Sequence, residues 1–220
     1  IGAADVSFNF VDYFYKMIST QAQREQMEAF VPTEYNNISL DSEGFIYATI
    51  STFDEKASNS ADPVRKLNAK GTDILIRNGY YDPEGDVQHG TGGGYSGPSK
   101  LIDVAVLDND CYYCLDSTRG RIFGYDFQGN MLYAFGGIGY REGNFKAPVA
   151  IENLGDSLLI LDKELGTITQ MTLTEYGTLI NEALNTYKVG EYDISADYWR
   201  EVLKLNGNYD LAYIGIGRSL

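Results

Sequence analysis

The central part of the chain reads DVAV at 103–106, YYCLD at 112–116 and GRIFGYD at 120–126. The same order returns as VAIE at 149–152, LLILD at 158–162 and GTITQM at 166–171. Asp116 and Asp162 are 46 residues apart. In both copies short apolar runs of strand length are separated by Gly, Asn and Asp, which are the residues that favour tight turns.

A third, earlier copy lies between residues 37 and 77, with predicted strands at 37–41, 45–50, 63–68 and 73–77. The polar turns at 68–72 and 126–130 also correspond, since each has a Gly three residues after its polar start. Repeats of about 45 residues that contain four short strands are typical of β-propeller blades. We therefore expect a mainly β fold with α additions, in which three blades form part of a propeller. Each blade should bury residues such as Val104, Val106, Tyr113, Leu115 and Ile122 against its neighbour.

Two helical regions flank the blades. Residues 9–30 carry apolar side chains at helical spacing, and Pro32 closes this segment. After Thr172 the apolar period changes from strand to helix, with breaks at Gly190 and Gly207. The expected organisation is a strand end and an amphipathic helix over 1–31, blades over 32–173, and a helical hairpin within a truncated repeat over 174–220.

Composition limits the partners. The formal net charge is −14 and the sequence pI is about 4.4, so we do not expect nucleic acid as a partner, because phosphate binding requires clustered Lys and Arg. Cys111 and Cys114 are expected to lie in one strand and to point to opposite faces, where they cannot form a disulfide with each other. They read as small packed side chains.

The residues GGIGYREGNFKAP at 136–148 link the two later copies. Their pattern, Gly-x-x-Gly-x-x-x-Gly-x-Phe-x-x-Pro, resembles the link between NHL repeats, a propeller family. The end of the chain resembles a tetratricopeptide repeat, through the Gly190-x-Tyr192-Asp193 turn and Trp199. In that comparison Ser195 stands where Ala is usual, and Gly207 stands where Pro is usual.

The whole arrangement is similar to a group of large Gram-positive bacterial proteins in which such parts precede a Yip-type multi-span membrane domain. The segments that carry this match are FVPTEY at 30–35, GFIY at 44–47 and NYDLAYIGIG at 208–217. The resemblance implies an extracytoplasmic domain that is membrane-anchored through other parts of a longer parent chain. That parent would supply further blades, further helical repeat and the membrane domain. Because the chain begins with Ile1 instead of Met and three blades cannot close a propeller, we expect it to be a piece of that parent.

The first functional hypothesis is a non-catalytic binding module for a protein or glycan, without a cofactor. Loops that should gather at one propeller face carry aromatic side chains and one cation that could contact such a partner: Tyr80, Tyr81, Tyr95, Tyr140 and Arg141. The Gly-rich segment 79–99 is read as a surface loop, because it leads into a strand and lacks the Gly-Lys-Ser/Thr order of a phosphate loop. His89 in this loop is the only His, and no Gly-x-Ser-x-Gly frame accompanies it.

The alternative hypothesis is a gluconolactonase-like, metal-dependent propeller hydrolase. Such an enzyme would hold a divalent cation, with calcium favoured by oxygen ligands, at the propeller axis. The inner strands offer Glu34, Asn36, Asn37, Asp103 and Glu152 as candidates. Calorimetric titration with calcium discriminates the two hypotheses. Asp108-Asn109-Asp110 has only the first residues of a calcium loop, so we read it as a tight turn.

Overall fold

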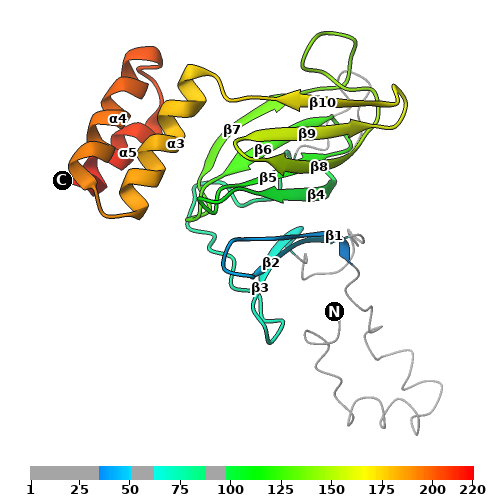
Figure 1. The fold of residues 1–220 in the computed structure, drawn as a ribbon, viewed down its shortest axis with the longest axis horizontal. Coiled ribbons are helices and arrows are strands. Elements are labelled where there is room, and N and C mark those ends of the chain that lie inside the picture. Colours follow the sequence, from blue (N-terminus) through cyan, green and yellow to red (C-terminus); the bar gives the residue numbers. More distant parts are fainter. Residues whose placement is uncertain (1–34, 51–61, 88–97) are drawn as a thin grey trace, which may run out of the picture.

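The computed structural model describes residues 35–50, 62–87 and 98–220. In this part, ten strands form three antiparallel sheets and three helices follow them (Figure 1). The expected N-terminal helix lies outside the described residues. The chain is mainly β with helical additions, as the repeat pattern predicts.

The central sheet is a four-stranded meander in the order β4-β5-β6-β7. Its strands are β4 (Leu101–Val106), β5 (Tyr112–Asp116), β6 (Arg121–Tyr125) and β7 (Met131–Gly136). Every residue of β5 is buried, including both those that point to one face and those that point to the other. A strand with this pattern must have side chains packed on both faces of its sheet.

The two faces of the central sheet belong to two separate apolar clusters. One cluster contains Val104, Val106, Tyr112 and Cys114 together with Tyr47 and Val64 of the first sheet. The other cluster contains residues of the opposite face with Ile151 and Ile160 of the third sheet: Ala105, Leu107, Tyr113, Leu115 and Ile122. All five residues that the repeat pattern selects as buried are therefore buried, but they divide between the two interfaces.

The two outer sheets have three strands each. The first contains β1 (Tyr35–Leu40), β2 (Ile46–Ile50) and β3 (Val64–Leu67), and the third contains β8 (Pro148–Leu154), β9 (Ser157–Asp162) and β10 (Thr167–Met171). The expectation of a fourth strand at 73–77 is wrong: only a single bridge between Leu67 and Asp73 forms there. The Asp73 carboxylate accepts hydrogen bonds from the backbone N–H groups of Lys66 and Leu75, so it holds a turn in place of a ladder.

The first strands of the three sheets lie side by side. Strand β4 contacts β1 on one side and β8 on the other. The buried carboxylate of Asp103 on β4 accepts a hydrogen bond of 2.7 Å from the Ile151 N–H on β8. Ile122 and Ile168 occupy equivalent positions in different sheets. Three meanders that stack through their faces and share a row of innermost strands are the blades of a partial β-propeller.

The recurring Asp residues have a common structural role. Asp162 accepts hydrogen bonds from the N–H groups of Lys146 and Ala147, which lie just before β8. It also accepts hydrogen bonds from the N–H groups of Glu164 and Leu165, which lie in the turn between β9 and β10. Asp116 does the same for Lys100, Thr118 and Arg119. Burial alone would raise the pKa of Asp162, but these backbone donors together hold it below the ordinary value. Asp116 and Asp162, which are 46 residues apart, therefore hold the segment that precedes the first strand of the central and third blades, respectively.

The helices α3 (Glu175–Lys188), α4 (Tyr192–Leu205) and α5 (Asp210–Ser219) follow β10 after the N-cap Thr174. Their buried residues, which include Ile180, Trp199 and Val202, join the cluster shared by the central and third sheets. The Tyr209 hydroxyl donates to the Leu132 carbonyl, and Lys188 pairs with Asp110 at 2.6 Å. The helical unit is therefore packed against the β6–β7 end of the central blade (Figure 1).

The repeat provides a matched pair of leucines that tests the stacking of the sheets. Leu115 is fully buried between the central and third blades, whereas its equivalent in the third blade, Leu161, is 41% exposed. We expect Leu115→Ala to lower the free energy of unfolding by about 3 kcal/mol and Leu161→Ala to lower it by less than about 1 kcal/mol, because only the first leaves a cavity. Urea unfolding followed by Trp199 fluorescence measures both values. Equal losses would contradict the stacking.

Candidate functional site

The sequence-selected aromatic residues lie at the surface but do not form one site. Tyr80 is 92% exposed and meets Tyr81 edge-on, with ring centroids 4.8 Å apart. Tyr140 is 87% exposed and its ring lies beneath the Lys146 ammonium. Arg141 is exposed as well, while Tyr95 and His89 lie outside the described residues. Two separate aromatic positions are thus available on the blade connections.

Among the candidate metal ligands that the structure describes, Asn37 hydrogen-bonds the Asp103 carboxylate and the Glu152 carboxylate lies close enough to raise the pKa of Asp103. Asp103 is buried, and its carboxylate is already occupied by hydrogen bonds from Val104 and Ile151. Burial raises the pKa of Asp103, against the effect of these bonds. Asn36 and Glu152 are exposed, and Glu34 lies outside the described residues. No group of three His, Cys, Asp or Glu side chains within the described ranges could hold a metal ion.

The two cysteines are buried and free. Only Cys114 lies in β5, since the strand begins at Tyr112, so the expectation that one strand holds both cysteines is wrong for Cys111. Cys111 belongs to one apolar cluster and Cys114 to the other, so they point to opposite faces as expected. Burial raises the pKa of both thiols well above the ordinary value, which makes them unreactive packing residues.

A groove of about 630 Å³ lies between the central blade, the third blade and the start of α3. Its floor is formed mainly by apolar and aromatic side chains, and β10 with the segment after it forms one wall. The lining includes Leu107, Tyr113, Tyr133, Phe135, Leu158, Met171, Leu173 and Tyr176. This volume is within the range of pockets that bind ligands or partner side chains.

The groove lies where the third blade, within the described residues, has one strand fewer than the central blade. In the central blade β7 follows β6 and completes the sheet. In the third blade the chain leaves β10 at Met171 and enters α3 at Glu175, so the described part contains no equivalent of β7. Tyr133 and Phe135 on β7 therefore line an open space on the side where a fourth strand of the third blade would lie.

Two tyrosine hydroxyls meet in the groove. Tyr113, Gly124 and Tyr133 form one row across β5, β6 and β7, and the tyrosine hydroxyl oxygens are 2.8 Å apart. Gly124 is required in this row, because a Cβ there would lie 2.8 Å from the Tyr113 ring. Burial raises the pKa of Tyr133 to about 12, and that of Tyr113 further. The two hydroxyls therefore stay uncharged and form a polar group within the apolar lining of the groove.

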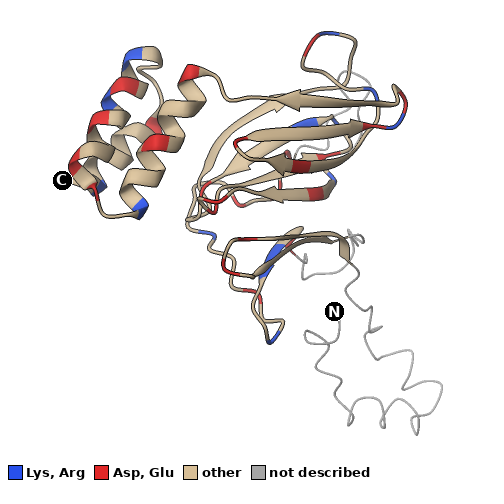
Figure 2. Cartoon of the chain, in the orientation of Figure 1, with Lys and Arg blue, Asp and Glu red and all other residues tan. Residues whose placement is uncertain are grey.

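Charge at the groove is of one sign. Glu142, in the segment between β7 and β8, and Asp156, in the β8–β9 turn, are exposed and are the only charged residues in the described lining of the groove. Figure 2 shows acidic residues distributed over the turns and helices of the chain. A ligand that occupies the groove would therefore meet an apolar floor and an acidic rim.

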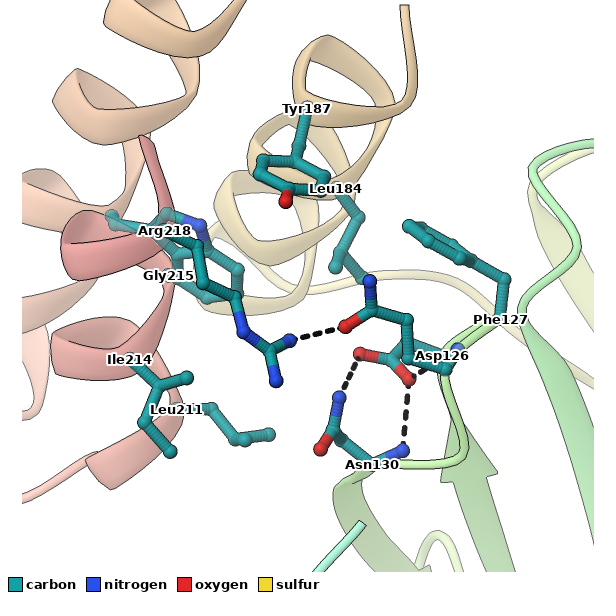
Figure 3. A pocket seen from close by; sticks show the side chains of 11 residues that line it. Asp126, Phe127, Asn130, Leu184, Tyr187, Leu211, Ile214, Gly215 and Arg218 are labelled. Atoms are coloured by element: carbon teal, nitrogen blue, oxygen red, sulfur yellow. Dashed lines mark hydrogen bonds between the residues drawn. The ribbon is translucent and has the colours of Figure 1, made fainter. Parts of the chain in front are cut away.

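A second, smaller hollow lies between the helices and the β6–β7 turn (Figure 3). The Asp126 carboxylate accepts hydrogen bonds from the N–H groups of Gln128 and Asn130 and from the Asn130 side chain. The side chain of Gln128 accepts a hydrogen bond from Arg218. Burial raises the pKa of Asp126. These groups satisfy one another, so we interpret this hollow as the joint between the helices and the blade.

Comparison with known proteins gives a limited result. No protein-family model and no curated protein matches the chain. Similar solved structures include virginiamycin B lyase from Staphylococcus aureus, at 12% identity and a TM-score of 0.37 over 66% of this chain and 43% of that chain. Another is the Cps50 (Swd1) β-propeller domain from Myceliophteria thermophila, at 14% identity and a TM-score of 0.38 over 67% and 43%.

A third is the extracellular domain of the putative hybrid two component system BT4673 from B. thetaiotaomicron, at 14% identity and a TM-score of 0.32 over 66% of this chain and 16% of that chain. The chain thus spans less than half the length of these structures. Among the described helices, none has the length and apolarity to cross a membrane.

The groove was not among the sequence-based candidates. The repeat pattern identifies Tyr113 only as a buried residue, and Tyr133 and Phe135 belong to no motif. The groove could have been predicted from the change of the apolar period from strand to helix after Thr172. At this point the repeat would place a fourth strand, but a helix begins instead.

The joint with the helices can be tested with two glycines of α5. A Cβ on Gly215 would lie 2.3 Å from the Trp199 indole nitrogen, whereas one on Gly217 would meet no atom within 4 Å. We expect Gly215→Ala to lower the free energy of unfolding by about 1–3 kcal/mol. Gly217→Ala should raise it by at most about 1 kcal/mol, through helix propensity. Thermal or urea unfolding checks both, and a stabilising Gly215→Ala would show that α5 does not pack on Trp199 as described.

The tyrosine pair predicts a loss of stability in alkali. Because the pKa of Tyr133 rises from 10.0 to about 12 on folding, the folded state keeps a proton that the unfolded state loses. The free energy of unfolding should therefore fall as the pH rises from 10 to about 12. Urea unfolding at several pH values measures the slope, and Tyr133→Phe should reduce it. A stability that does not change over this interval would contradict the burial of the pair.

Proposed function

We propose that the chain is a non-catalytic binding module that holds a protein or glycan partner in the groove between its central and third blades. The observation that carries this proposal is the groove itself, which is large, apolar and formed by rigid strands of two blades. Tyrosine hydroxyls and an acidic rim give it the few polar contacts that orient a partner. The fixed charges lie at the rim, where they would favour a basic partner.

The lactonase alternative has one observation in its favour within the described ranges, the proximity of Asn37 and Glu152 to Asp103, but no group of three carboxylates or other ligands of the His, Cys, Asp and Glu types gathers there. Its buried candidate, Asp103, uses both carboxylate oxygens to accept backbone N–H groups. This arrangement serves the contact between two blades and leaves the carboxylate poorly placed to bind calcium.

The proposed setting is an extracytoplasmic, membrane-anchored protein with NHL-type blades and a tetratricopeptide-like helical part. The setting rests on the resemblance of the sequence, and two structural details bear on the NHL-like link and on the departure at Ser195. Gly136 has φ +80, and a Cβ there would lie 2.8 Å from the Gly120 carbonyl oxygen, while Phe145 is buried, which gives the NHL-like link its structural reason. Ser195, in place of the usual Ala, donates its hydroxyl to the Ala183 carbonyl at 2.7 Å between α4 and α3.

Further blades of a parent chain would cover the outer face of the third sheet. Leu154 and Ile168 on this face are 60% and 67% exposed, whereas their equivalents Leu107 and Ile122 are covered by the third blade. An apolar blade face of this kind is normally an interface. The proposed parent blades would lie here and leave the groove accessible at the outer rim.

The binding function can be tested on glycan and peptide arrays with the labelled chain. We expect the ligands that the unmodified chain binds on the arrays to bind no longer to the Thr169→Trp variant, because the new side chain fills the groove from β10. The Ile168→Trp variant should still bind them, because this side chain lies on the opposite face of the same strand. The absence of any ligand on both arrays, or binding that Thr169→Trp leaves unchanged, would contradict the proposal.

A further inference from the structure

One wall of the groove is strand β10, which is an edge strand among the described residues. Strand β10 pairs with β9 on one side, and the described part has no strand on its other side. The edge of an antiparallel sheet presents alternate backbone N–H and C=O groups that a further strand can pair with. Thr169, Gln170 and Met171 of this edge all line the groove. A backbone ladder and a pocket for side chains therefore lie next to each other.

We propose that the partner is an extended segment of another protein, which adds to β10 as the fourth strand of the third blade and places alternate apolar side chains in the groove. This inference rests on the proposed binding function and specifies its ligand class. Strand addition of this kind derives affinity from main-chain hydrogen bonds and specificity from pockets for alternate side chains. A compact glycan or small molecule would make no use of the edge.

The central blade shows the register that such a strand would adopt. There β7 pairs with β6 through Ile122 and Phe135 and through Phe123 and Ala134. The repeat makes Ile168 and Thr169 the equivalents of Ile122 and Phe123. Directly opposite residues of paired strands share a face, so partner residues opposite Thr169 and Met171 would point to the same side as these groove-lining residues. On that side, the side chains of the partner would meet Tyr133, Phe135 and Leu158, which also line the groove.

The rim selects the charge of the segment. Both charged lining residues, Glu142 and Asp156, are acidic and exposed, and the chain as a whole has a formal net charge of −14. Lys or Arg near the ends of the added strand would face these carboxylates, whereas an acidic segment would be repelled. The expected ligand is thus a short β-forming segment with alternating aliphatic residues and flanking basic residues.

The test uses the full 220-residue chain and a synthetic peptide of about nine residues, which is near the upper length of a usual strand. In this peptide Val alternates with Thr between terminal Lys residues. Two further peptides carry N-methyl groups on one or the other alternate set of backbone nitrogens. We expect the unmodified peptide to bind and only one N-methylated form to bind at least about tenfold more weakly, because only one set of N–H groups faces β10. Fluorescence anisotropy measures the three affinities.

Variants locate the site. Thr169→Trp should abolish binding and Ile168→Trp should retain it. Glu142→Lys combined with Asp156→Lys should weaken binding several-fold and improve binding of a peptide with terminal Glu residues. Circular dichroism and urea unfolding show that each variant is folded before its affinity is compared.

Several outcomes would overturn the inference. Equal affinity of the two N-methylated peptides would exclude pairing with the edge, as would binding that survives Thr169→Trp. Failure of every peptide while the arrays keep a ligand sensitive to Thr169→Trp would leave the groove as a binding site but exclude strand addition. Concentration-dependent self-association that Thr169→Trp removes would assign the edge to a second copy of the chain.

Discussion

The structure depends on the covering of both faces of the central sheet. A single antiparallel sheet with one covered face would alternate buried and exposed residues, yet β5 is buried throughout. Tyr112 and Cys114 require one neighbouring sheet, and Tyr113 and Leu115 require another. Once both neighbours are in place, the inner strands align and Asp103 can connect two blades through the Ile151 N–H. The arc of three blades follows from this arrangement.

The same repeat explains where the groove arises. Blades that use equivalent residues should have equivalent edges, but the chain turns into α3 before the third blade receives its outer strand. The helices then pack on the β6–β7 end of the central blade, through Trp199 and Tyr209, and do not fill the space beside β10. The absence of a fourth strand from the third blade, within the described residues, thus leaves a large concave surface beside β10.

Much of the fold was predictable from the sequence, because turn residues and apolar runs recur at fixed spacing. The buried set around Leu115, the opposite orientation of Cys111 and Cys114, and the helical change after Thr172 all follow from local periodicity. The missing strand at 73–77 did not follow, because Asp73 captures the Lys66 and Leu75 N–H groups, a contact that no period encodes. The groove was not predictable either, since it depends on how Tyr133, Leu158 and Met171 meet from three distant segments.

The most direct test of the account is the set of nuclear Overhauser contacts made by two adjacent residues of β5. The account predicts contacts between the rings of Tyr112 and Tyr47, whose centroids are 5.3 Å apart, and contacts from Tyr113 to its cluster partners of the third sheet, among them Leu158. Both sets must be present in the same sample of the folded chain. If either set is absent while the protein is folded, only one face of the central sheet is covered and the blade arrangement is wrong.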